Sequence, residues 1–350
     1  MANGMRQNHL LHNLAALLCL LGAISCTKDY SGRAIRFSAS TRPDAAYTKT
    51  AFSGVVTSDI ERIDWVAGDK IMLAMKNDDV TNSQMAYDIT GISADGRYSR
   101  AGLEKSGGGS GGLQWGTGTH DFWAAYPSTA TVGDHTITSN IPAVQTITYK
   151  TKTNNTLIYA PDMTKALMVA GIQSAPSGSG INLDFAPAFT TFDFTVGANS
   201  DVVITGFTME TITSAEASKN ILSGDATATF DSSMACEYSA TGSTGQSIST
   251  TFSPAAAIST TTSLNFKLFA VPSEIKGVTI AFTISSPVAN TLRLRLKYSE
   301  AQGGDWLEFG ACTKCNISGL LVPGAQWTIT MDGPRVEQWT IVPEVVFGVE

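Results

Sequence analysis

Two cysteines near the C-terminus have the spacing of a redox or metal site. Cys312 and Cys315 are separated by two residues. A redox pair needs a thiolate stabilised at a helix start, and a structural zinc ion needs four ligands. The flanking segments instead resemble strands, and His120 and His135 are far away in the sequence. We therefore interpret the pair, like Cys236, as structural thiols, and we leave open whether Cys312 and Cys315 are oxidised.

The other side chains with chemical potential form no recognisable catalytic motif. The sequence contains no nucleophile elbow, zinc-protease helix, calcium loop or dinucleotide fingerprint. Carboxylate pairs such as Asp78 with Asp79, or Asp64 with Asp69, could serve a glycosidase, but we favour solvated turns. Ser106–Gly112 lacks the Lys-Ser/Thr ending of a phosphate loop, so we expect a flexible hairpin tip. The sequence thus predicts no enzyme, no metal and no cofactor.

Cys26 has the most definite chemistry, because it ends a segment that resembles a signal peptide. A weakly basic start, residues 5–9, precedes an apolar run from Leu14 to Ile24. That run is about half of the roughly 20 residues that span a bilayer. We predict cleavage after residue 25 and acylation of the Cys26 thiol, palmitate included, although Ala23 stands where leucine is commoner. An ordinary secretory signal is the alternative.

Composition limits the class of the mature protein. The chain has 350 residues, a net charge of −7 and 15% charged residues, which gives no basic footprint for nucleic acid. Its length fits two domains. With five cysteines in all, it has no disulfide framework. After the signal segment, no run is long and apolar enough to cross a membrane. We expect an exported protein that does not bind nucleic acid.

Short alternating runs rich in Val, Ile, Thr and Phe dominate the mature chain and predict β-strands. The clearest runs are Ile35–Ala39, Lys70–Ala74, Phe189–Val196, Val202–Met209, Leu264–Val271, Val278–Ile284 and Thr291–Tyr298. In the last run, leucines alternate with Arg293 and Arg295, as in a half-buried antiparallel strand. Helical periodicity is limited to a turn or two near Pro161–Met168. The expected fold is all-β, with antiparallel β-sandwich domains.

A Ser/Gly-rich stretch near the middle of the chain predicts the domain boundary. Ser174–Gly180 precedes a fresh series of strands. We therefore expect two sandwich domains, at residues 50–178 and 179–336, with the boundary placed to within about ten residues.

A series of short motifs runs through most of the mature chain. They are Thr48–Phe52, Trp65–Ile71, His120–Pro127, Ile141–Thr146, Met168–Ala170, Phe185–Phe194 and Gly319–Gly324. In this order, after a lipoprotein-type signal, they resemble landmarks of the fimbrillin-like family, the major and minor subunits of type V pili in Bacteroides and Porphyromonas relatives. Individually these residues are typical of scaffold positions, such as the turn at Gly68 and the strand end at Pro127.

The resemblance implies two transthyretin-like or immunoglobulin-like β-sandwiches. It implies export as a lipoprotein, anchored by Cys26 in the outer membrane, and assembly into extracellular pili that serve adhesion. In that scheme a protease removes an N-terminal strand after a basic residue, and the groove accepts a donor strand from a neighbouring subunit by β-strand addition. A host or bacterial surface receptor is a further implied partner.

Counterparts of the removable strand and its cleavage sites lie within residues 26–49. The strand would be Ala34–Ser40, with Ile35, Phe37 and Ala39 on one face. Arg42 and Lys49 are the candidate cleavage sites, although the proline after Arg42 should hinder a trypsin-like cut.

The counterpart of the donor strand is the terminal segment, residues 337–350. Apolar residues occupy every second position there: Trp339, Ile341, Pro343, Val345, Phe347 and Val349. Burying five of them would contribute on the order of 10 kcal/mol before ordering costs. Pro343 suits an inserted or edge strand. The alternative is that this tail finishes the sheet of its own domain.

The sequence leaves two functions to compare. The first is a pilus subunit, with the stalk, anchor or tip role open. The second is a surface lipoprotein that does not polymerise and binds glycans through exposed aromatic side chains such as Trp115 or Trp123.

Mass spectrometry of the mature surface protein tests the lipid prediction. We expect an acylated Cys26, or a new N-terminus after Arg42 or Lys49 where maturation has removed the lipid with the N-terminal strand. A mature chain that begins elsewhere and carries no acyl group would contradict the prediction.

Overall fold

The structure is a computed structural model that describes residues 31–41, 51–52, 63–77, 83–95, 98–109, 111–212, 219–240, 245–275, 277–298, 307–309, 311, 314–322, 328–332 and 339–342. Its regular structure is β-strand except for one 3-10 helix, Met163–Lys165. This confirms the all-β class, and each expected strand is present. Within these ranges, no helix has the length and apolarity needed to cross a membrane.

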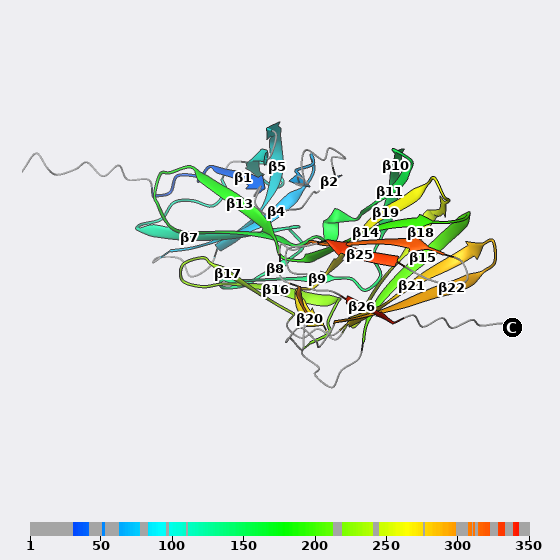
Figure 1. The fold of residues 1–350 in the computed structure, drawn as a ribbon. Helices are drawn as coiled ribbons and strands as arrows, with labels where there is room; N and C mark the ends of the chain where they lie inside the picture. Colours follow the sequence, from blue (N-terminus) through cyan, green and yellow to red (C-terminus); the bar gives the residue numbers. More distant parts are fainter. Residues whose placement is uncertain are drawn as a thin grey trace, which may run out of the picture.

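Seven strands close into a barrel (Figure 1). In spatial order they are β1 (Phe37–Thr41), β13 (Ile181–Pro187), β12 (Met168–Pro176), β7 (Thr119–Tyr126), β4 (Lys70–Lys76), β5 (Ser83–Asp95) and β6 (Tyr98–Lys105). Neighbours pair antiparallel, except that β1 runs parallel to β13. Because β1 pairs with β13 on one side and β6 on the other, it closes the barrel.

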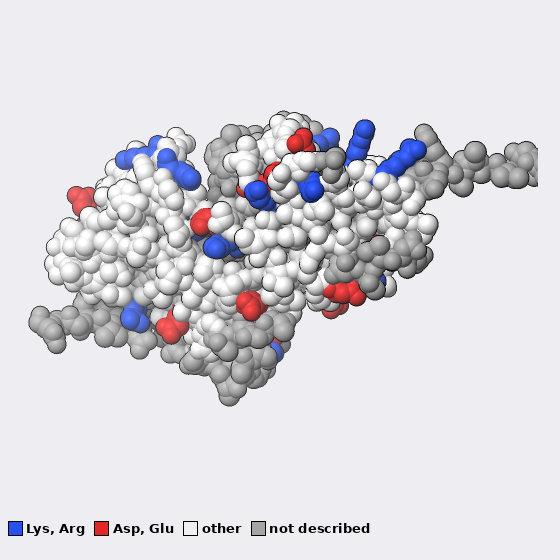
Figure 2. Space-filling model, turned by 180° about the vertical axis from the view of Figure 1, so that it is seen from behind, with Lys and Arg blue, Asp and Glu red and all other residues white. Residues whose placement is uncertain are grey.

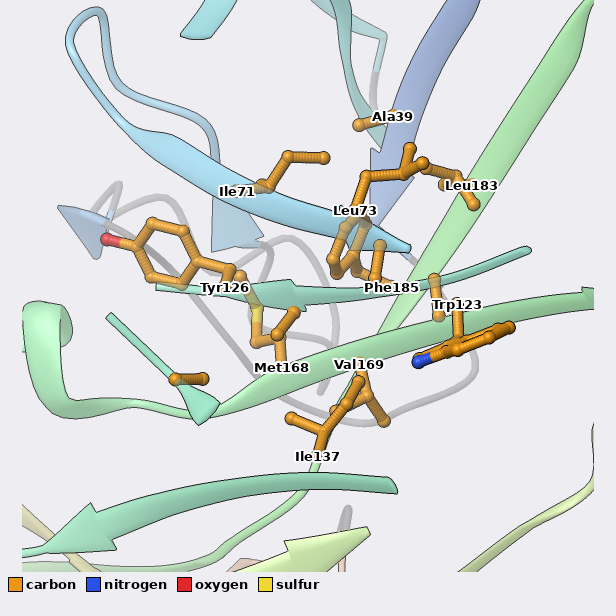
Figure 3. Close-up of a cluster of buried hydrophobic side chains, with 14 of the residues drawn as sticks. Ala39, Ile71, Leu73, Trp123, Tyr126, Ile137, Met168, Val169, Leu183 and Phe185 are labelled. Carbon is orange, nitrogen blue, oxygen red and sulfur yellow. The ribbon is translucent and has the colours of Figure 1, made fainter. Parts of the chain in front are cut away.

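A four-stranded sheet packs on the outside of this barrel. Its order is β17 (Cys236–Ser239), β16 (Gly224–Phe230), β9 (Thr136–Ile141) and β8 (Thr131–Val132). Trp123 of β7 and Ile137 of β9 are fully buried in the same core, and Figure 3 shows Val169 of β12 directed toward Ile137. A Cβ atom on Gly171 would lie 2.8 Å from the Phe230 ring, so glycine permits this close approach.

Two further sheets form the second half of the molecule. One has the order β10 (Ile147–Thr153), β11 (Thr156–Pro161), β19 (Ser263–Ala270), β14 (Thr190–Ala198), β24 (Lys314–Leu321) and β25 (Thr328–Asp332). The other has the order β18 (Ser247–Ile258), β15 (Val202–Thr211), β21 (Gly277–Ser286), β22 (Asn290–Tyr298) and β26 (Trp339–Val342). Two short pairs remain, β2 (Ala51–Phe52) with β3 (Ile63–Asp64) and β20 (Ser273–Ile275) with β23 (Leu307–Phe309).

Phenylalanine side chains fill the space between these two sheets. Phe194 and Phe266 come from the first sheet, and their ring centroids lie 4.8 Å apart. Phe207 of the second sheet contacts Phe194 at 4.6 Å and Phe282 at 5.0 Å. All four rings are buried, so these contacts form the centre of a sandwich core.

The two halves of the chain are interwoven. The β10–β11 hairpin lies in sequence between the barrel strands β7 and β12, but β11 pairs with β19 in the second half. Conversely, β16 and β17 follow the barrel in sequence, and β16 pairs with β9 to cover it. Each core therefore contains strands from both halves of the chain.

The crossing from β9 to β10 is fixed by Gln145, a member of the Ile141–Thr146 motif. Its buried side-chain amide donates to the Phe269 carbonyl at 2.5 Å and accepts from the Phe269 N–H at 2.9 Å. Its backbone N–H donates to the Ser249 carbonyl at 2.8 Å. Gln145 therefore satisfies backbone groups of β18 and β19 as a short strand would.

The predicted boundary at residues 178–179 falls in the turn between β12 and β13, and both strands belong to the barrel. The change of core comes later, because Phe189 packs in the first core and Phe192 in the second. Interweaving means that no single division of the sequence separates the cores. The two domain ranges stay a prediction.

The glycine-rich segment 106–112 differs from the expected hairpin tip. Residues 106–109 form a turn, but the segment joins β6 to a bridge between Gln114 and Ala34. It does not connect two paired strands. The polar turn was correctly predicted from composition. The pairing of Gln114 with Ala34 after it was not predicted.

Interweaving predicts that damage to β16 destabilises the barrel. Phe230→Ala should lower the free energy of unfolding by about 3–5 kcal/mol, because it removes a buried ring from the interface with β12. The measurement is urea denaturation followed by tryptophan fluorescence. Thr229→Ala, at the neighbouring exposed position, is the control and should cost less than about 1 kcal/mol. Equal effects of the two variants would contradict the interweaving argument.

Candidate functional site

Charge does not single out a binding surface. Figure 2 shows that Lys, Arg, Asp and Glu side chains are few and scattered over the face drawn there. Backbone edges and apolar strand faces are the other features that can bind a partner, and two strands bear on the predicted assembly: β1 and β26.

The backbone of β1 is paired along both edges. Phe37–Thr41 runs in register with Ile181–Phe185 of β13, and residues 37–40 run antiparallel to residues 100–103 of β6. The Ile181 N–H donates to the Arg36 carbonyl at 3.0 Å. The strand is thus a fully paired member of the sheet.

Pairing continues on the N-terminal side of β1. The Gly32 N–H donates to the Trp115 carbonyl at 2.8 Å, and the Trp115 N–H donates to the Arg33 carbonyl at 2.9 Å. The Ile35 N–H donates to the Leu113 carbonyl at 2.9 Å. Residues 32–41 therefore occupy one continuous groove, bordered by residues 113–115, β6 and β13.

The inner face of β1 and of the residues just before it carries three apolar side chains. Ile35, Phe37 and Ala39 are buried in the barrel core, with exposures of 6%, 6% and 0%, as expected from their alternation. The Phe37 ring meets Tyr87 and Phe122 edge to face, at centroid distances of 5.3 and 5.5 Å. Phe37 is therefore the largest of the three side chains and is held between two aromatic rings, which form the Phe37 pocket.

Tyr87 connects this pocket to the border of the groove. Its hydroxyl accepts a hydrogen bond from the Leu113 N–H at 2.8 Å. Burial raises the pKa of Tyr87, and the Leu113 hydrogen bond opposes that shift. The phenol therefore stays neutral and supports the edge on which residues 32–35 pair.

The outer face of β1 carries two serines that bond to β13. Ser38 donates to the side-chain oxygen of Asn182 at 3.0 Å, and Ser40 donates to the Asp184 carboxylate. The Asn182 amide donates to Ser40 at 3.1 Å and to Asp184 at 2.8 Å. Sequence reasoning missed these four residues, because Ser38 and Ser40 looked like ordinary solvent-facing positions.

The predicted lipidation and cleavage residues, Cys26, Arg42 and Lys49, lie outside the described residues. Their sequence positions are still informative. Arg42 directly follows β1, and Lys49 lies two residues before the start of β2. Both therefore belong to the segment between two described strands.

Strand β26 places the start of the C-terminal tail on its own domain. Trp339–Val342 pairs antiparallel with β22 and forms the edge of the five-stranded sheet. Ile341 is the register partner of Leu296, and Trp339 of Tyr298. For these residues the structure has the alternative in which the tail finishes its own sheet. Pro343, Val345, Phe347 and Val349 lie outside the described residues.

Three of the family-like motifs meet at one end of the barrel. The Tyr126 hydroxyl donates to Asp69 at 3.1 Å, and Asp69 also accepts from the Val66 N–H at 2.8 Å. Trp65 packs edge to face on Tyr126 and Phe185. Burial, together with Asp69, raises the pKa of Tyr126 far above its ordinary value. These residues hold the turn before β4 in place.

The aromatic residues expected to bind glycans are buried. Trp115 is 3% exposed and Trp123 is 0% exposed. Trp115 packs against His120 and Phe122, whereas Trp123 stacks on His135 and donates to the Gly133 carbonyl at 3.0 Å. The prediction that these rings are exposed was wrong, because the four-stranded sheet and residues 31–35 cover them.

The thiols are poor candidates for redox chemistry. Cys315 is buried in the sandwich core, and burial raises its pKa to about 12. Burial likewise raises the pKa of Cys236 to about 11. Both therefore stay protonated near neutral pH. The partner Cys312 lies outside the described residues, as do Asp78 and Asp79, and no cluster of metal-ligating side chains occurs in the part of the chain searched.

The fold and the candidate site define a class of protein. It is an all-β protein with two packed cores, in which a strand near the N-terminus closes the barrel. The chain belongs to the fimbrillin-like family, whose sequence model matches residues 55–331. This confirms the resemblance found in the motifs. The match includes neither β1 nor the tail after residue 331.

Solved structures with the same fold come from Bacteroides species. A candidate cell adhesion protein from Bacteroides uniformis is 16% identical with a TM-score of 0.51, over 85% of this chain and 98% of that one. A second, from Bacteroides ovatus, is 12% identical with a TM-score of 0.52, over 92% of this chain and 100% of that one. These likenesses show the fold alone. A comparison with curated proteins found no match.

The Phe37 pocket predicts how much β1 contributes to stability. Phe37→Ala should lower the melting temperature by about 5 °C or more, since it leaves a cavity between Tyr87 and Phe122. Arg36→Ala, at the exposed position just before β1, is the control and should shift it by about 1 °C or less. Differential scanning calorimetry measures both. A Phe37→Ala chain that melts with the parent would show that β1 does not support the barrel.

Proposed function

We propose that this protein is a structural subunit of a cell-surface pilus, or fimbrium, that assembles by exchange of a β-strand between neighbouring subunits and serves adhesion. Its role is structural and not catalytic. The observation that carries the proposal concerns β1, which closes the barrel. The covalent link from β1 to the rest of the barrel is the segment that holds both candidate cleavage sites. Membership of the fimbrillin-like family supports it.

Removal of β1 would create a site for another strand. The facing edges of β6 and β13 would lose their backbone partners, and the positions of Ile35, Phe37 and Ala39 would empty. Unpaired edges beside an apolar groove bind extended segments by β-strand addition. Refilling the Ile35 and Phe37 positions would contribute roughly 1.5–3 kcal/mol each.

The proposed donor is the C-terminal tail of a second copy. In this arrangement β26 stays paired with β22 on its own sheet. The residues after Val342 cross to the next subunit. Pro343 stands at the exit, where a missing N–H costs least. Val345, Phe347 and Val349 then offer three apolar side chains at every second position, which equals the set on β1.

Phe347 is the proposed anchor of the donor strand. It is the central member of its set, as Phe37 is of the set on β1. Alignment of the two sets therefore places Phe347 in the pocket of Tyr87 and Phe122 whichever direction the donor runs. The valines fill the flanking positions, and a valine at the Ala39 position is the tightest fit.

Lipidation and cleavage fit the same scheme. An acyl group on Cys26 would tether the uncut chain to the outer membrane, and cleavage after Arg42 or Lys49 would separate that lipid from the body of the protein. The subunit would then pass from a membrane-bound form to an extracellular fibre. Neighbouring subunits are its proposed partners, with a host or bacterial surface as the adhesion target.

Substitution of Phe347 tests strand exchange. The mature chain, treated with mild trypsin and checked by mass spectrometry for a new N-terminus after Arg42 or Lys49, should form a ladder on electrophoresis without boiling. Phe347→Ser should abolish the ladder, because a polar side chain cannot fill the Phe37 pocket.

Val346→Ser is the matched control. It alters the neighbouring residue, which faces the other way in a strand, and should leave the ladder intact. Loss of the ladder in Val346→Ser but not in Phe347→Ser, or no ladder from the cut parent, would contradict the proposal.

A further inference from the structure

We infer that Ser38, Ser40, Asn182 and Asp184 form a register lock that favours β1 over a donor strand while the subunit is uncut. The inference rests on the proposed strand exchange and adds the residues that would keep exchange from starting too early. In this inference, the polar outer face of the groove distinguishes β1 from a donor strand, whereas the apolar inner face accepts any strand with side chains of suitable size.

The lock is a closed network between two strands. The Asn182 side chain uses its oxygen to accept from Ser38 and its amide to donate to Ser40 and Asp184. The Ser40 hydroxyl in turn donates to Asp184, and Ser40 is buried. Each hydroxyl group therefore finds its acceptor directly across the parallel pair.

The network also depends on register. Ser38 lies opposite Asn182 and Ser40 lies opposite Asp184. A shift by two residues would keep apolar side chains inward, but it would move both serines away from their partners. The outer face therefore distinguishes registers that the inner face alone would accept.

The donor tail cannot reproduce this network. With Phe347 at the Phe37 position, the Ser38 position receives Gly348 or Val346, depending on direction. Neither side chain can donate to Asn182.

At the Ser40 position, the same alignment brings Glu350 or Glu344 opposite Asp184. Like charges directly opposite each other destabilise a strand pair. Arg100, the register partner of Ser40 on β6, would attract the same carboxylate and offset part of this repulsion. The Asp184 charge is therefore the part of the lock that acts against the donor itself.

Amide hydrogen exchange of the uncut chain tests whether the four residues stabilise β1 in the barrel. Ser38→Ala with Ser40→Ala should raise the exchange rates of the backbone amides of residues 37–41 about tenfold. The control is Thr138→Ala with Thr227→Ala, which removes a cross-strand hydroxyl pair from the four-stranded sheet and should leave β1 unchanged. Unchanged protection of β1 in the serine variant would overturn the lock.

Peptide binding tests selection against the donor. The receptor is the cut chain carrying Phe347→Ser, which disables its own tail, and the probe is a labelled peptide of residues 339–350. Asp184→Asn should tighten binding about tenfold by removing the opposed charge. Asp225→Asn is the matched control, because Asp225 accepts from Asn140 across strands elsewhere, and should bind as the parent receptor does.

The outcomes separate the two proposals. A parent receptor that fails to bind the peptide refutes strand exchange itself. Peptide binding that Asp184→Asn does not strengthen overturns the lock and leaves strand exchange standing. Tighter binding by Asp184→Asn, together with faster exchange in the serine variant, supports both.

Discussion

The backbone pairing of β1 is the interaction on which the N-terminal half of the molecule depends. A barrel is free of edges only while every strand is paired on both sides, and β1 supplies the last pair on each side of the gap. The same strand fills the inner pocket beside Tyr87 and Phe122. In the proposed assembly, the element that completes the fold is therefore also the element that a neighbouring subunit would replace.

Among the described residues, the contacts that hold the rest of the structure together do not involve β1. The β16–β17 hairpin covers the barrel from outside, and Gln145 ties the crossing segment to β18 and β19. Neither feature contacts the gap left by β1 through the described hydrogen bonds. In the proposed assembly, these contacts would stay in place while the occupant of the groove changes.

The sequence predicted local structure better than partners. Alternation located β1 and its buried face of Ile35, Phe37 and Ala39, because a period of two is a property of the strand alone. It could not reveal that Ser38 meets Asn182, because that contact joins residues 144 positions apart. Trp115 was misplaced for the same reason, since its backbone pairs with Gly32 and Arg33 far back in the chain. Trp123 was misplaced because the segment with Gly133 and His135 folds back onto its ring. Composition located the turn in Ser174–Gly180, but it could not show that the strands on both sides, β12 and β13, belong to one barrel.

The interweaving of the two halves has a mechanical consequence. If the halves were joined by a simple linker, a pull on the two ends of the chain could straighten the linker and separate them with little resistance. Here separation requires β16 to leave β9 and β11 to leave β19, and each step breaks a row of backbone hydrogen bonds. Tension is therefore shared between two hairpins, and the molecule can transmit a load from one end to the other without coming apart at its middle.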